Sequence, residues 1–154
     1  LNKRKTDLVD VCQDTVKRFE PQVLGKKITI VTDCKEADLW VAADKERLQQ
    51  ILDNLMQNAL RYTPNEGWIK FGLKKTGGLA HITIHNSGPQ LSPEAQKHLF
   101  ERFYRAEKAR DRESGGTGLG LAIARQLAEA HGGSLSGSNH PNGGVVFELT
   151  LPLL

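Results

Sequence analysis

The chain has 154 residues, of which 38% are hydrophobic and 25% charged, a composition that excludes a disordered chain and fits one domain with a sizeable core. The net charge of +3 is too small and too dispersed for nucleic acid to be the main partner. No apolar run approaches the roughly 20 residues of a membrane span, and the two cysteines lack the spacing of a disulfide-rich scaffold or a zinc ribbon.

The N-terminal part of the chain predicts a helix followed by two strands. Apolar residues recur at helical spacing over about 7–24, with Asp7 as a cap and Gly25 as a stop. The β-branched run 28–31 and the run 38–42 predict strands. Trp40, in the second of these runs, is expected in the sheet core, and so is Trp68 further along the chain.

The central part predicts a long helix and a hairpin. The helix begins after Asp44, a plausible cap, and its pattern stops at Pro64. Its apolar stripe consists of Leu48, Ile51, Leu52, Leu55, Met56 and Ala59. Alternation over 67–75 and 79–86, with glycines between the two runs, predicts a β-hairpin.

The C-terminal part predicts a short helix opened by 92–94, a charged loop over 104–116 and a helix over 117–131. A last pair of strands is predicted over 134–138 and 145–151. Hairpins interleaved with helices indicate an α/β fold, a two-layer sandwich with the helices on one face of the sheet.

A polar stripe lies on the central helix. Asn54, Asn58 and Arg61 share a face roughly 130° around the helix from the apolar stripe. An amide oxygen is a hard, neutral ligand that suits Mg²⁺, and an arginine one turn further on can meet phosphate oxygens. The alternative interpretation is that the two asparagines are merely solvated or cap a neighbouring loop.

A glycine-rich turn precedes the last long helix. Glycines at 115, 116, 118 and 120 let backbone N–H groups approach an anion, where the helix dipole adds about +0.5 charge. The turn is not a P-loop, because no Lys-Ser or Lys-Thr follows it. It is not the dinucleotide fingerprint either, because its glycine spacing differs and no strand precedes it. The alternative is a flexible loop with a glycine-rich helix cap.

Four motifs, in this order and spacing, together resemble the catalytic domain of sensor histidine kinases. Residues 52–62 (LDNLMQNALRY) resemble the N box, and 86–89 (NSGP) stand where the first glycine box lies. Residues 100–105 (FERFYR) resemble the F box, and 116–121 (GTGLGL) match the second glycine box. Each motif alone is weak, but the set is highly specific.

The resemblance implies the Bergerat fold, with a mixed, mostly antiparallel sheet of about five strands packed on three helices, and it implies ATP and Mg²⁺ as ligands. By this resemblance Asn58 would coordinate Mg²⁺, Asn54 would line the triphosphate and also serve the chemistry, and Asn86 would face the adenine. Arg61 and Tyr62 would contact phosphate or ribose.

The resemblance also makes residues 104–116 the ATP lid. Arg105 or Lys108 would swing over the γ-phosphate when the lid closes, although the mixed charges also suit a solvated loop. Gly118 and Gly120 would hold the phosphates. The full set assigned to the nucleotide is Asn54, Asn58, Arg61, Tyr62, Asn86, Gly88, Gly116, Thr117, Gly118, Leu119, Gly120 and Leu121.

Two positions bear on activity. Gyrase-type and heat-shock ATPases of the same fold carry a glutamate, the base that activates water, where this chain has Asn54, and an amide takes no proton at neutral pH. This favours phosphoryl transfer over hydrolysis, unless Asp53 or Glu46 acts as the base instead.

The first glycine box departs from its usual form, D-x-G-x-G, because Asn86 stands at the Asp position and Gln90 at the last Gly position. The loss of the charged acceptor predicts weak ATP binding with reduced base selectivity. The alternative is that the substitution is benign and the affinity for ATP is ordinary.

Domain organisation and partners follow from the same resemblance. Residues 1–6 are expected to be the tail of a linker and 7–154 the catalytic domain. No histidine lies in a phosphoacceptor motif, so the expected partners are a separate dimerisation domain and a response regulator. This piece is expected to be monomeric, the full-length protein a membrane-anchored homodimer with this domain in the cytoplasm. The rival functions are an ATP hydrolase and a non-catalytic interaction domain.

Overall fold

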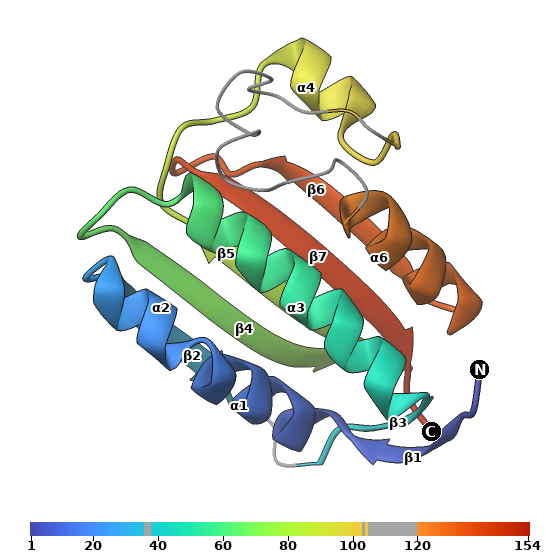
Figure 1. Ribbon diagram of the computed structural model, residues 1–154. Coiled ribbons are helices and arrows are strands. Elements are labelled where there is room, and N and C mark those ends of the chain that lie inside the picture. The colour runs from blue at the N-terminus through green and yellow to red at the C-terminus, as the bar shows by residue number, and fades with distance from the viewer. Residues whose placement is uncertain (36–37, 103, 105–119) are drawn as a thin grey trace.

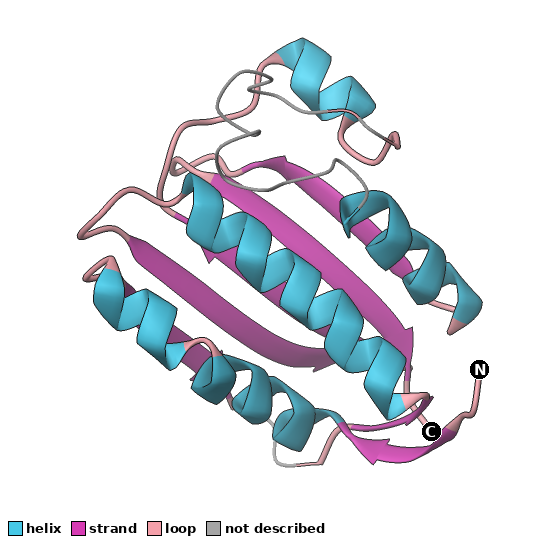
Figure 2. Cartoon of the chain, in the orientation of Figure 1, coloured by secondary structure: helices cyan, strands magenta, loops and turns pink. Residues whose placement is uncertain are grey.

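The architecture is a five-stranded sheet with helices across one face. The computed structural model describes residues 1–35, 38–102, 104 and 120–154. Figure 1 and Figure 2 show the helices α1, α2, α3 and α6 lying over the same side of the large sheet. Among the described residues, the helices are α1 (Leu8–Arg18), α2 (Glu20–Gly25), α3 (Lys45–Tyr62), α4 (Pro93–His98) and α6 (Gly120–Ala130).

The large sheet is mixed, as expected. Its strand order is β2-β4-β5-β7-β6, in which β2 and β4 are parallel and the other pairs antiparallel. Its strands are β2 (Thr29–Cys34), β4 (Trp68–Thr76), β5 (Leu79–Asn86), β6 (Ser134–Asn139) and β7 (Val145–Pro152). A second, two-stranded antiparallel sheet pairs β1 (Arg4–Asp7) with β3 (Trp40–Ala43). The two-layer α/β sandwich is therefore confirmed.

The core lies between the sheet and the helices. Alternate residues of β4 and β5 are buried, and the whole predicted apolar stripe of α3 is buried against them. The prediction that Trp40 and Trp68 belong to this core is wrong, because their exposed fractions are 36% and 37%. Trp68 precedes the buried Ile69 in a pleated strand, so it points to the opposite face. Its ring meets His85 edge-on, with the centroids 4.8 Å apart.

The N-terminal segment differs from its prediction in two ways. The expected single helix is two helices, separated at Phe19, because Pro21 opens α2 and a proline inside a continuous helix would clash with the preceding turn. Residues Arg4–Asp7, expected within or next to a linker tail, form the strand β1. The linker boundary itself stays a prediction.

The start of α3 is capped as predicted. Asp44 accepts a hydrogen bond from the backbone N of Arg47, at 3.4 Å, through Oδ1. The backbone N–H of Asn2 also donates to this carboxylate, at 3.0 Å, and holds the pKa of Asp44 below its usual value. The short helix α4 likewise begins at its predicted cap, where Ser92 accepts from Ala95 N at 3.0 Å.

The end of the chain agrees with the prediction for the last helix and the last strands, where the structure describes them. The helix α6 is described from Gly120 onward, and the predicted loop at 104–116, apart from Tyr104, lies outside the described residues. Within the described part of the chain, no helix is both long enough and apolar enough to cross a membrane.

Candidate active site

The polar face of α3 meets the beginning of α6. The side-chain Nδ2 of Asn54 donates a hydrogen bond to the carbonyl oxygen of Gly120, at 3.1 Å. A Cβ atom added to Gly120 would lie 3.7 Å from the amide of Asn54, at ordinary van der Waals distance, so the backbone at the start of α6 passes close to this side chain. Figure 1 shows α3 and α6 side by side over the sheet. The structure thus brings together the amide stripe and the start of the helix that follows the glycine-rich turn.

The C-terminal end of the same helix meets the first glycine box. Gly88 lies so close to α3 that a Cβ atom there would be 2.6 Å from the carbonyl oxygen of Tyr62. Only a glycine allows this approach without moving the helix end. The polar face of the C-terminal half of α3 therefore runs from the contact of Asn54 with Gly120 to the contact of Tyr62 with Gly88, with Asn58 half-buried between them and Arg61 exposed.

Asn86 ends β5 beside Gly88 and is 4% exposed. Its Nδ2 donates to the carbonyl oxygen of Ser87 at 3.2 Å, which fixes the orientation of the amide. The opposite atom, Oδ1, is then an acceptor, which suits an amino group such as that of adenine. Leu121, also assigned to the nucleotide, is partly buried and packs against the core.

Six of the assigned residues cannot be located. Arg105 and Lys108 of the expected lid lie outside the described residues. The same holds for four residues of the second glycine box, namely Gly116, Thr117, Gly118 and Leu119. Their roles stay predictions that rest on the resemblance.

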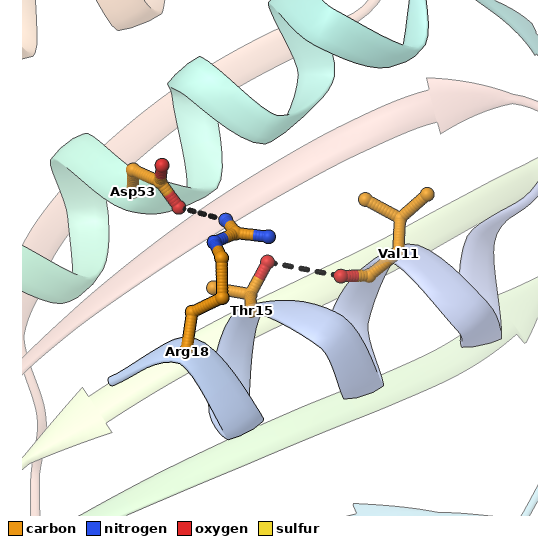
Figure 3. A network of polar contacts seen from close by, with 4 residues as sticks. All are labelled: Val11, Thr15, Arg18 and Asp53. Atoms are coloured by element: carbon orange, nitrogen blue, oxygen red, sulfur yellow. Dashed lines mark hydrogen bonds and ion pairs between the residues drawn. The ribbon is translucent and has the colours of Figure 1, made fainter. Parts of the chain in front are cut away.

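The carboxylates considered as alternative bases point elsewhere. Asp53 forms an ion pair with Arg18 of α1, and Figure 3 shows these side chains facing one another between the two helices. Beside them, the Thr15 hydroxyl donates to the carbonyl oxygen of Val11 at 2.9 Å and stays within α1. Glu46 lies in the first turn of α3, about 12 Å along the helix axis from Asn54.

A lysine that sequence analysis did not single out secures the C-terminal end of α3. The Nζ of Lys26 donates to the carbonyl oxygens of Leu60 and Thr63, the latter at 2.7 Å. These carbonyls belong to the last turn and the C-cap of α3, where backbone acceptors lack partners within the helix. Burial lowers the pKa of Lys26. No sequence spacing relates this lysine to residues 34 and 37 positions away.

Replacing Lys26 by methionine is expected to lower the free energy of unfolding by about 1–3 kcal/mol, because two carbonyl groups lose a charged donor while the apolar stem is retained. Urea unfolding measures the change. The matched control is Lys27→Met in the same turn, since the Lys27 side chain is exposed. Equal losses in the two variants would show that the contact with α3 contributes nothing.

The sequence is similar to known proteins over most of its length. The family model of histidine kinase-, DNA gyrase B- and HSP90-like ATPases matches residues 43–154. The histidine-protein kinase BaeS of Escherichia coli K12 is 42% identical over 151 residues, covering 98% of this chain and 32% of BaeS. The chain spans only 25% to 32% of the length of the first curated relatives it matches.

Solved structures extend the similarity to the whole chain. The catalytic domain of histidine kinase ThkA is 30% identical with a TM-score of 0.88, and the match covers 99% of this chain and 97% of that domain. Histidine kinase ThkA in complex with the response regulator TrrA matches with 29% identity and a TM-score of 0.84, over 99% of this chain and 42% of that one.

Proposed function

This chain belongs to the family of histidine kinase-, DNA gyrase B- and HSP90-like ATPases, as a catalytic domain of sensor histidine kinases, and we propose that it presents the γ-phosphate of ATP to a histidine of a separate dimerisation domain. The single observation that carries the proposal is the position of Asn54. The residue that meets the start of α6 is an amide, and an amide cannot deprotonate water.

The neighbouring carboxylate does not replace this missing base. Asp53 is held by Arg18 on the α1 side of the helix, whereas Asn54 contacts α6. A general base must lie within hydrogen-bonding reach of the proton that it accepts. The site is therefore suited to an acceptor that brings its own nucleophile, such as an imidazole, and poorly suited to activating water.

The α3 face fits a magnesium nucleotide. Asn54 and Asn58 are half-buried on one face, and the start of α6, where the helix dipole favours an anion, lies against Asn54. In this proposal Asn58 supplies an oxygen ligand and Asn54 borders the triphosphate, while Arg61 and Tyr62 contact phosphate or ribose. The metal, when bound, neutralises charge on the phosphates, and the chain itself contributes mainly positioning.

The catalytic test is a transfer assay between separate proteins. This chain is mixed with a phosphoacceptor helical hairpin and γ-labelled ATP, and the label on the hairpin is compared with the phosphate released. We expect transfer to the hairpin histidine with little release of phosphate by the chain alone. Steady phosphate release without transfer would identify a hydrolase, and no binding of nucleotide at millimolar concentration would identify an interaction domain.

The partners follow from the transfer chemistry. In the proposed full-length protein, the dimerisation domain provides the phosphoacceptor histidine and forms a homodimer, while this domain alone is a monomer. The phosphoryl group then passes to an aspartate of a response regulator. The complex of ThkA with TrrA supports a regulator as partner. We propose that the domain works in the cytoplasm on a membrane-anchored protein.

Changing Asn86 to aspartate is expected to raise the affinity for ATP about fivefold and to leave that for GTP unchanged or lower. A carboxylate is a charge-assisted acceptor for the adenine amino group, roughly twice as strong as the amide, and repels the O6 of guanine. Calorimetric titration with both nucleotides measures the effect. Asn142→Asp, the same change on an exposed turn, is the control. No gain for ATP would refute the assignment of Asn86 to the adenine.

A further inference from the structure

The segment after Asn86 lacks the backbone pairing that fixes the strand before it. Ser87 N still donates to the carbonyl oxygen of Trp68 at 2.9 Å, and Ser92 opens α4. Between them, residues 88–91 make no backbone–backbone hydrogen bond within the described part of the chain. Gly88 lies in this stretch, against the end of α3. Something other than backbone pairing must therefore hold the stretch in place.

One side chain at the end of β6 supplies the missing pairing. Asn139 Oδ1 accepts from the backbone N of Leu91 at 2.7 Å, and Asn139 Nδ2 donates to the backbone O of Leu91 at 2.9 Å. Both polar groups of one amide are thus matched to both polar groups of one residue's backbone. Two bonds at one residue fix both its position and its orientation, as a neighbouring strand would.

The turn that follows Asn139 adds further contacts to the same region. The Nε2 of Gln90 donates to the carbonyl oxygen of His140 at 2.8 Å. The ring of His140 stacks on that of His85, with centroids 4.0 Å apart, and His85 Nε2 lies 2.8 Å from the carbonyl oxygen of Gly143. The turn therefore contacts both the end of β5 and the segment that follows it.

We propose that Asn139 is a positioning residue for the base end of the nucleotide site. It holds Leu91, and through Leu91 the short stretch back to Gly88 and Asn86, in the conformation that receives the adenine. Asn139 acts through this segment and does not touch the nucleotide. The inference rests on the proposed function, and it gives Gln90, which departs from the family pattern, a specific role as a second attachment of the same segment.

The test is Asn139→Asp in the whole chain, with Mg²⁺ and ADP as the probe. An ionised aspartate accepts from Leu91 N but cannot donate to Leu91 O, so at pH 8 we expect about tenfold weaker binding of ADP. Inorganic triphosphate with Mg²⁺ lacks the base, so we expect it to bind Asn139→Asp and the wild-type chain equally. A merely structural defect would weaken the binding of both ligands.

The controls separate the possible causes. Asn142→Asp adds the same charge on the exposed part of the turn and should bind ADP normally. Unchanged ADP binding in Asn139→Asp, or an equal loss for ADP and for triphosphate, would overturn the inference.

A second variant keeps the test decisive if Asn139→Asp does not fold. Gln90→Ala removes only the bond from an exposed side chain to His140 O, and we expect about threefold weaker ADP binding with an unchanged melting temperature. Wild-type binding in Gln90→Ala would overturn the inference. If the wild-type chain binds no ADP, the proposed function fails before any variant is compared.

Discussion

Replacing Asn58 by alanine is expected to weaken the binding of magnesium nucleotide by about 100-fold and to abolish detectable phosphoryl transfer. Asn58 lies half-buried on the polar face of α3, between the contact of Asn54 with Gly120 and the contact of Tyr62 with Gly88. Mg²⁺ in nucleotide sites typically takes only one or two protein ligands, so the loss of one oxygen removes much of what the protein contributes.

Titration of the chain with ATP, in Mg²⁺ and then in EDTA, measures this effect. We expect the difference between wild-type and Asn58→Ala protein to be large with the metal and to disappear when EDTA removes it. Gln57→Ala is the matched control, since Gln57 is a neighbouring, exposed amide on the same helix. A loss that persisted in EDTA, or an equal loss in Gln57→Ala, would exclude Asn58 as the magnesium ligand.

Sequence periodicity predicted those parts of the fold that local pattern determines. The helix α3 and the hairpin of β4 and β5 lie where the apolar periods place them. The strand β1 was missed because it is short and its residues pair with β3 residues 33 to 39 positions away, so no local alternation marks it. Trp68 differs from its prediction because the alternation of β4 puts Ile69 in the core and therefore puts the preceding side chain on the opposite face, whatever its type.

The same distinction applies to the site. The helix face and the glycine-rich turn each carry a sequence signal, and the meeting of Asn54 with the start of α6 was expected because the resemblance assigns Asn54 and Gly120 to the same nucleotide. Lys26 and Asn139 carry none, since each bonds to the backbone of a residue far away in sequence, 48 positions away for Asn139. A side chain that hydrogen-bonds to the backbone of a distant segment leaves no local pattern in the sequence, so its role is seen only in the folded structure.

Replacing Gly144 by alanine is expected to lower the free energy of unfolding by about 3–5 kcal/mol and to weaken nucleotide binding as well. Gly144 has a φ of +73°, and a Cβ atom there would lie 1.9 Å from the carbonyl oxygen of Asn86. The nearest obstacle is backbone, which cannot rotate away as a side chain can. Relief of the clash requires the turn to separate from the end of β5, where Asn86 is positioned.

The variant Gly143→Ala tests whether the effect expected at Gly144 comes from backbone strain or from the steric clash with Asn86. Gly143 also has a positive φ, +101°, but a Cβ atom there would have no neighbour within 4 Å. Its replacement should cost only the backbone strain, about 1–2 kcal/mol, and leave nucleotide affinity nearly unchanged. Urea unfolding and ADP titration of both variants measure the contrast. If Gly144→Ala were no worse than Gly143→Ala in either measurement, close approach of the turn to Asn86 would not be what holds the base end of the site.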